Sequence, residues 1–242
     1  PALGGWGHLA DGSGWQPWAW GFLAGSFNAM SGLLLYRAFE IGKMAVVAPL
    51  SASYPALTLL LSWMTGERVS TVRIVGILCT LAGVVVVAGG EKTPDENDAE
   101  AVQRSGRGIG WAVFAAVGFA VLFWLLGTRV IPSVGAIQTV WMIRLTSALL
   151  TAAVVLISKQ PMQLPHDEVR WMVLSMGAFD TGAFVLSNLG MKMEQVAVVT
   201  VLSSLYGAVT VGFAAIFLKE RVSRWQWIGI VTIFVGIFLI SR

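Results

Sequence analysis

Long apolar segments separated by short polar turns dominate the chain. Eight of them are long enough to cross a bilayer as a helix, which takes about 17–25 residues. They cover residues 17–38, 44–65, 71–90, 108–128, 137–158, 171–190, 195–218 and 225–241. The strands of a membrane barrel would be about half as long and would alternate in polarity. The pattern therefore predicts an all-α integral membrane protein folded as a multi-span helical bundle.

The composition agrees with lipid as the solvent. Apolar residues make up 56% of the chain, charged residues make up 12%, and the mean hydropathy is +0.76, whereas about a quarter of an ordinary soluble domain is charged. This composition excludes a soluble or disordered protein. The net charge of +3 is too small to indicate a nucleic-acid partner. The single cysteine, Cys79, rules out an internal disulfide and a cysteine-based metal cluster.

An internal duplication relates the two halves of the chain. Residues 45–55 (AVVAPLSASYP) align with residues 197–207 (AVVTVLSSLYG) at an offset of 152. A slip of one residue then aligns Gly76 with Gly229 and Gly83 with Gly236. The matched spans are an odd number of crossings apart, so the two copies have opposite orientations in the membrane. Many secondary transporters are built from such inverted repeats, with the substrate site between them near mid-bilayer.

The second copy contains five predicted spans and the first only three. We therefore divide the chain into an N-terminally incomplete first repeat (1–90), a polar linker (91–107) and a second repeat (108–242). The equivalents of the first two spans of the second repeat would precede Pro1. We expect eight helices of a ten-helix protein; the alternative is a natural protein with eight spans.

Each repeat also carries a Glu-Arg link before its last span, at residues 67–68 and 220–221, and residues 143–150 read IRLTSALL. With these features the chain resembles the EamA-type transporters of the drug/metabolite transporter superfamily. The resemblance implies paired five-helix repeats and a solute carrier, commonly an exporter of amino acids or other small metabolites, that does not hydrolyse ATP. No P-loop, HExxH or GxSxG motif is present, so we expect no enzyme activity, no cofactor and no metal site.

Two ionisable side chains lie inside predicted spans and away from their ends. Asp180 is the tenth of 20 residues in its span, and Arg144 is the eighth of 22. Ionisable residues in a bilayer are costly and usually functional. Asp180 can carry a proton or bind a substrate ammonium group, and Arg144 can hold a substrate carboxylate; the alternative is a structural ion pair. Asn28 occupies the equivalent position to Asp180, and Asn188 shares the helix face of Asp180.

Helix-breaking residues occupy equivalent positions in the two repeats. They are Pro55 and Gly207, which directly follow Tyr54 and Tyr206. Interrupted helices at corresponding positions of inverted halves indicate a transporter's binding site. Serines precede both breaks, and their hydroxyls can satisfy freed carbonyls or bind a polar solute; the alternative is that they only permit close packing. These serines are Ser51, Ser203 and Ser204.

These patterns predict a secondary transporter that exports an amino acid or related solute by alternating access, with proton coupling at Asp180. The alternative is a non-transporting, degenerate membrane interaction protein of the same fold. The expected partners are the solute, membrane lipid and protons, with no nucleic acid. The spacing of Gly21 and Gly25 is that of a close-packing face and is compatible with a homodimer.

The expected location is the plasma (inner) membrane of a prokaryote, but two arguments disagree about orientation. The count of Lys and Arg residues in the loops puts the C-terminus outside. The family resemblance implies a cytoplasmic C-terminus.

Overall fold

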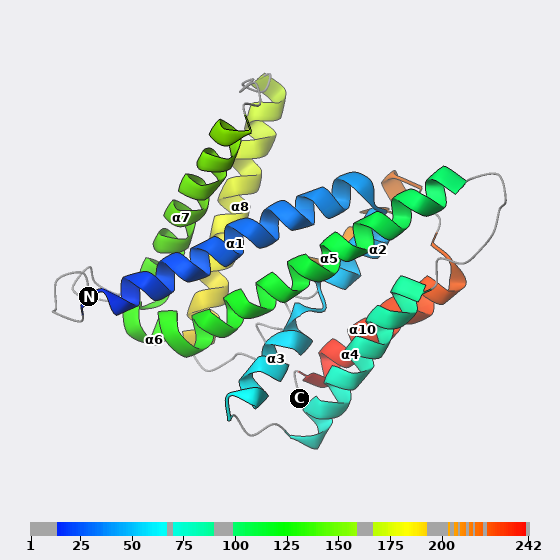
Figure 1. Ribbon diagram of the computed structural model, residues 1–242, viewed down its shortest axis with the longest axis horizontal. Helices are drawn as coiled ribbons and strands as arrows, with labels where there is room; N and C mark the ends of the chain where they lie inside the picture. Colours follow the sequence, from blue (N-terminus) through cyan, green and yellow to red (C-terminus); the bar gives the residue numbers. More distant parts are fainter. Residues whose placement is uncertain are drawn as a thin grey trace. The chain divides into compact units, whose positions relative to one another are not determined.

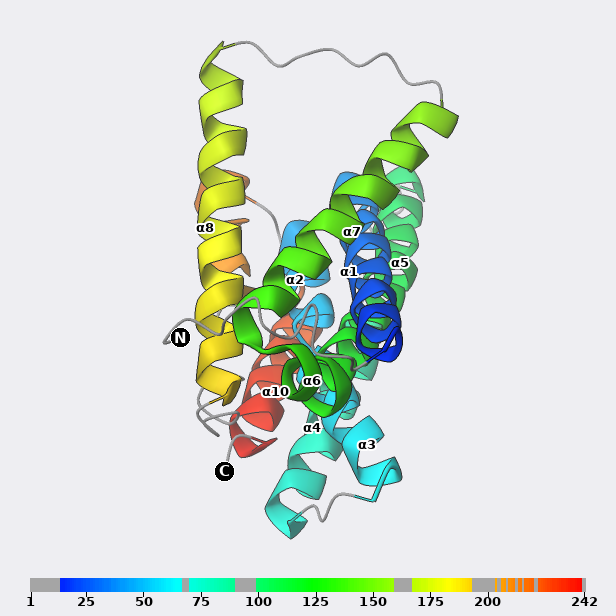
Figure 2. The same ribbon diagram turned by 90° about the vertical axis from the view of Figure 1, so that its left-hand side faces the viewer.

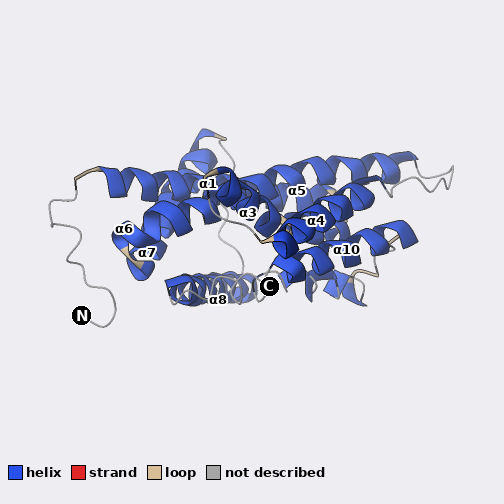
Figure 3. Ribbon diagram, turned by 90° about the horizontal axis from the view of Figure 1, so that it is seen from below, coloured by secondary structure: helices blue, strands red, loops and turns tan. Residues whose placement is uncertain are grey.

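The computed structural model describes most of the chain. The described residues are 14–66, 70–89, 99–158, 167–192, 203, 206–207, 209–211, 213–214, 216–219 and 222–240, with the backbone alone at 88–89, 99–107, 167–168 and 191–192. Every secondary-structure element in this part of the chain is helical (Figure 3). The all-α fold predicted from the sequence is confirmed.

The described helices are labelled in Figure 1. In order they are α1 (Gln16–Ile41), α2 (Met44–Ser51), α3 (Tyr54–Met64), α4 (Thr71–Gly89), α5 (Ala99–Leu125), the π-helix η2 (Leu126–Val130), α6 (Ile131–Val134), α7 (Ala136–Ile157), α8 (Asp167–Lys192) and α10 (Arg224–Ile240). The segments at 44–64, 108–134, 136–157 and 169–190 are long and apolar enough to cross a membrane, and 71–87 and 224–240 are shorter apolar helices. The protein is therefore an all-α membrane bundle.

Two predicted boundaries differ from the observed ones. The second expected span is two helices, because α2 ends at Ser51 and α3 begins at Tyr54. The fourth begins at Ala99, within the part assigned to the polar linker, and its helical path continues to Val134. It ends at Gly135, whose φ of 93° is a backbone conformation that glycine adopts readily.

The chain forms two compact units. One comprises residues 1–29 and 125–195, and the other comprises residues 30–124 and 196–242. Each unit combines helices from both halves of the sequence, so packing does not follow the order of the chain.

In the first unit, α7 packs against the beginning of α1 and against α8. A Cβ atom on Gly25 would lie 2.5 Å from the Cβ of Thr146, and one on Gly21 would collide with Met142. Small residues allow helices to approach this closely in lipid. The face that we considered for a homodimer is therefore occupied by α7 of the same chain. Figure 2 shows α8 lying nearest to the start of α7 and diverging toward the other end.

In the second unit, α4 and α10 lie side by side (Figure 1). A Cβ on Gly76 would lie 2.8 Å from the carbonyl oxygen of Gly236, and a Cβ on Gly83 would lie 2.8 Å from that of Gly229. Early residues of α4 therefore meet late residues of α10, so the two helices are antiparallel. The two glycine contacts are related by the internal repeat. Replacing Gly76 and Gly236 by their repeat equivalents, Gly229 and Gly83, turns the first contact into the second.

The core of this unit surrounds the contact between α2 and α10. Leu50 and Val47 of α2 pack with Ile233 and Ile237 of α10, and all four are at most 1% exposed. This packing holds α2 in place, and with it the turn at residues 52–53 that precedes α3.

Candidate functional site

The charged pair predicted from the sequence meets in the first unit. Nη2 of Arg144 on α7 lies 2.7 Å from Oδ2 of Asp180 on α8. The side chain of Arg144 is 31% exposed and that of Asp180 is 58% exposed. Both residues belong to helices long and apolar enough to span a membrane. An ion pair within such helices is costly to desolvate unless further hydrogen bonds support it.

The guanidinium of Arg144 has unused hydrogen-bonding capacity. Its Nη2 atom is engaged in the ion pair with Asp180, whereas its Nε atom is buried and has no hydrogen-bond partner in the described part of the chain. Its carbon Cζ lies 5.2 Å from the ring centroid of Phe184, a cation–π contact from α8. Since arginine offers five N–H donors, the side chain is oriented by Asp180 and Phe184 and keeps donors for a further anionic group.

Asn28, the first-repeat equivalent of Asp180, also contacts α7. The amide nitrogen of Asn28 on α1 donates a 3.0 Å hydrogen bond to the hydroxyl of Ser147, and Ser147 in turn donates to the carbonyl oxygen of Gly25 at 3.2 Å. Arg144 and Ser147 are three residues apart on α7, so they are neighbours on the helix surface. We call Asn28, Arg144, Ser147 and Asp180 the ion-pair cluster.

Asn188 lies two turns after Asp180 on α8 and is completely buried. Its amide nitrogen donates a 3.3 Å hydrogen bond to the carbonyl oxygen of Ala136, which is the first residue of α7. Its Oδ1 atom has no hydrogen-bond partner among the described residues. The side chain therefore fastens the end of α8 to the start of α7 and is not itself in the ion-pair cluster.

The second group of predicted site residues meets in the second unit. The hydroxyls of Ser51 and Tyr206 are 3.0 Å apart, and Ser51 also donates to the carbonyl oxygen of Ala48 at 2.9 Å. Ser203 makes a side-chain hydrogen bond with Tyr54. Each tyrosine thus bonds to the serine of the other repeat. We call Ser51, Tyr54, Ser203 and Tyr206 the Ser–Tyr cluster.

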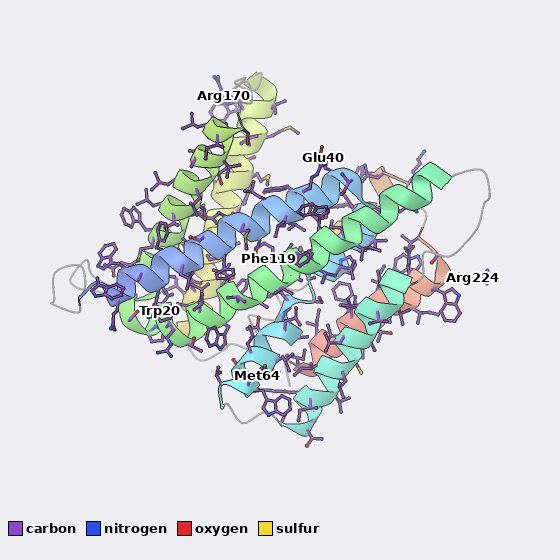
Figure 4. The ribbon with its side chains drawn as sticks, in the orientation of Figure 1. Trp20, Glu40, Met64, Phe119, Arg170 and Arg224 are labelled. Atoms are coloured by element: carbon purple, nitrogen blue, oxygen red, sulfur yellow. The ribbon has the colours of Figure 1, made fainter. Side chains whose placement is uncertain are left out.

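Aromatic rings from α5 support one side of the Ser–Tyr cluster. The ring of Tyr54 stacks on Phe123 at a centroid distance of 4.7 Å and lies 6.2 Å from Phe119 in a tilted arrangement; Figure 4 shows Phe119 on α5. Tyr54 is 7% exposed, whereas Tyr206 is 37% exposed. The two equivalent side chains therefore differ in overall exposure, although the hydroxyl of Tyr206 is bonded to the fully buried Ser51.

The predicted helix breakers behave differently from one another. Pro55 lies in the first turn of α3, where its missing N–H costs no hydrogen bond, so the interruption falls just before it. Gly207 is itself helical, and a Cβ there would lie 2.9 Å from the Cβ of Ala52. It packs against the interruption of the first repeat. Ser204 lies outside the described residues.

Two contributors were not predicted from the sequence. Ser147 follows Arg144 by three residues and Phe184 follows Asp180 by four, which are the spacings that place side chains on one helix face. That periodicity was the available signal. Within the described part of the chain, no three His, Cys, Asp or Glu side chains gather into a group that can hold a metal ion.

Comparison with known proteins identifies the family. The EamA-like transporter family matches residues 2–89 and 106–242. The chain belongs to the EamA-like transporter family. A protein of Synechocystis sp. (strain ATCC 27184 / PCC 6803 / Kazusa) named "Uncharacterized transporter" is 25% identical over 255 residues, covering 94% of this chain and 72% of that protein.

The resemblance inferred from the repeats is therefore confirmed. As a member of the EamA-like family with apolar spanning helices, the protein is an integral membrane transporter.

Proposed function

We propose that this EamA-like protein is a secondary transporter that exports an amino acid or a related small solute by alternating access, with proton coupling at Asp180. The observation that carries the proposal is the ion pair between Arg144 and Asp180, 2.7 Å apart on two apolar spanning helices. Ionisable groups at such positions generally mark substrate or proton pathways.

The ion-pair cluster has the charges that a zwitterion needs. An amino acid carries a carboxylate and an ammonium group. The guanidinium of Arg144, whose Nε has no hydrogen-bond partner among the described residues, suits the carboxylate, and the half-exposed carboxylate of Asp180 suits the ammonium group. Substrate binding would exchange one ion pair for two, so the charges stay balanced inside the membrane.

Asp180 also has the chemistry required for coupling. Protonation of its carboxylate removes the negative charge that holds Arg144 and that would hold a substrate ammonium group. A proton and the substrate amine therefore cannot bind to this carboxylate at the same time. This mutual exclusion is what exchange of protons for substrate requires. Asn28, at the equivalent position of the first repeat, has no ionisable side chain, so the proposed proton site exists in one repeat only.

The Ser–Tyr cluster supplies the second element of the proposal. Hydroxyls beside an interrupted spanning helix are suitable ligands for a polar solute. Tyr206 is the more exposed of the two tyrosines, and a solute that entered the cluster would replace its hydrogen bond to Ser51.

The test is solute-stimulated proton flux in proteoliposomes, with protein expressed from its complete reading frame and a panel of amino acids and amines. Wild type is compared with Asp180→Asn and with Glu40→Gln, which removes an exposed carboxylate paired with Arg37. We expect saturable flux in wild type and Glu40→Gln and none in Asp180→Asn. Flux that persists in Asp180→Asn with unchanged pH dependence would make the ion pair structural. If no solute produces flux, the result favours the alternative of a non-transporting membrane protein of the same fold.

A further inference from the structure

A groove follows one face of α10, and the proposed transport function makes no use of it. Its volume is about 480 Å³, within the roughly 300–1,000 Å³ typical of small-ligand sites. Trp227 lines one end, Phe238 the other, and Phe234 lies between them along the helix. Val211, from the segment before α10, completes an entirely apolar lining.

The groove lies in the second repeat, and its lining can be compared with the equivalent positions of the first. The first-repeat equivalents of Val211 and Phe234 are Leu59 and Leu81. Both leucines pack against a buried cluster formed by Ala56 of α3, Ile77 of α4 and Ile240 of α10. Phe234 also packs against the hydrophobic core, so this position is a packing residue in both repeats and in the second also lines the groove.

The length of the groove matches one leaflet of a bilayer. Trp227 and Phe238 are eleven residues apart, so at 1.5 Å per residue the groove follows α10 for about 16 Å. One leaflet of a hydrocarbon core about 30 Å thick is of that depth. An extended acyl chain lying along α10 would therefore have the groove beside it over its full length.

The end of the groove at Trp227 carries exposed positive charge. Arg224 begins α10, Lys219 lies five residues earlier, and both are exposed; Figure 4 shows Arg224 at this end of α10. The backbone N–H of Gln226 donates to the hydroxyl of Ser223 at 3.1 Å, and the N–H of Ser223 donates to the side-chain carbonyl of Gln226 at 3.0 Å. This capping box fixes the start of α10, and so fixes Arg224 just above Trp227.

We propose that the groove binds an acyl chain of an anionic phospholipid, whose headgroup is held by Arg224 and Lys219. Three observations on α10 support this occupant: an apolar lining, a length of one leaflet, and basic residues beside an indole at the end where a headgroup would lie. Tryptophan and basic residues at helix ends characteristically sit at headgroup level, and basic residues there attract anionic lipid.

Lipid binding to the purified, delipidated protein tests the proposal. Native mass spectrometry measures the affinities for phosphatidylglycerol and for phosphatidylcholine with the same acyl chains. Val235→Trp fills the groove from a half-exposed lining position, and Ile228→Trp places the same side chain at an equally exposed position outside it. The double variant Lys219→Gln/Arg224→Gln removes the charge, and Arg37→Gln is its control.

We expect wild type to prefer phosphatidylglycerol, and Val235→Trp to weaken the binding of both lipids about tenfold while Ile228→Trp does not. Each charge removed near the groove should lower the preference for phosphatidylglycerol about fivefold. Equal affinity for the two lipids in wild type, or equal effects of the two tryptophan variants, would overturn the proposal. So would a dimer of wild type that Val235→Trp dissociates, because a second copy would then be the occupant.

A second measurement needs no groove-filling variant. Phosphatidylglycerol brominated along its acyl chain quenches nearby tryptophan fluorescence. We expect Trp227→Phe to remove a larger share of that quenching than Trp225→Phe, because only Trp227 lines the groove. Equal shares would contradict the proposal even if Val235→Trp failed to fold.

Discussion

Ser51 and Tyr206 hydrogen-bond at 3.0 Å although they are 155 residues apart, and their repeat equivalents, Ser203 and Tyr54, also bond to each other. A reciprocal pair of contacts is the signature of two-fold symmetry. The antiparallel glycine contacts of α4 and α10 obey the same rule. The second unit thus retains the symmetry of the duplication in its hydrogen bonds as well as in its sequence.

This relationship predicts that two equivalent substitutions both lower the stability of the protein. Tyr54→Phe and Tyr206→Phe each remove one hydrogen bond, and each should lower the free energy of unfolding by about 1 kcal/mol. Tyr54→Phe should have the larger effect, because Tyr54 is buried and leaves Ser203 without its partner. Thermal unfolding in detergent measures both. Tyr36→Phe, at a tyrosine that is 58% exposed, is the control and should leave stability unchanged; equal losses in all three variants would contradict the prediction.

The glycine contacts of α4 and α10 predict a steric effect. Gly83→Ala places a Cβ 2.8 Å from the carbonyl oxygen of Gly229, and the resulting overpacking should cost about 1–3 kcal/mol. Gly229→Ala should cost a similar amount, and the double variant less than the sum, since helices already separated have room for a second methyl group.

Gly110→Ala is the control for these substitutions. Gly110 is helical and exposed, and a Cβ there meets no atom within 4 Å. Its replacement should be neutral or stabilising, because alanine is the better helix former. The measurement is the midpoint of thermal unfolding for all four variants. If Gly110→Ala lowered the midpoint of thermal unfolding as much as Gly83→Ala, the close contacts between α4 and α10 would not explain the loss of stability.

Exchanging the charges of the ion pair separates a structural role from a transport role. Arg144→Asp and Asp180→Arg should each destabilise the protein, because each leaves like charges facing one another inside the membrane. The double variant restores opposite charges and should recover most of the thermal stability. It should not recover solute flux, since a substrate carboxylate and ammonium group would then meet the wrong helices. Full flux in the double variant would show that the pair only joins α7 to α8.

Sequence periodicity predicted the spans at 44–65, 108–128, 137–158 and 171–190, which the structure confirms as helices long and apolar enough to cross a membrane, because lipid imposes a strict rule on length and polarity. Most of the span expected at 195–218 lies outside the described residues. The sequence pattern placed the helix interruption near Pro55 correctly, since a proline is well accommodated in the first turn of a helix and disfavoured in its interior, although α2 itself contains Pro49. It did not predict that α5 begins at Ala99. Residues 99–107 are polar, and a helix that extends beyond the bilayer has no apolar pattern to reveal it.

The candidate site was predictable where repeat equivalence constrained it. The duplication paired Ser51 with Ser203 and Tyr54 with Tyr206, and these four residues do meet. The partner of Asn28 was not predictable, because Ser147 belongs to α7, a helix without an equivalent in the first half of this chain. The distribution of helices between the two units was hidden for a related reason: α1 contributes to both, and nothing in its apolar pattern marks the point of division.

The glycine seam between α4 and α10 also limits how this transporter can move. Its four glycines bring backbone against backbone, and a Cβ at any of them would lie within 2.9 Å of a carbonyl oxygen of the other helix, so a change of register that brings a larger residue into the contact would overpack it. The glycine contacts therefore fix the register of α4 and α10, and the two helices must move together as a rigid pair. Any conformational change within the second unit must leave this helix pair intact, so we expect its hinge at the turn between α2 and α3.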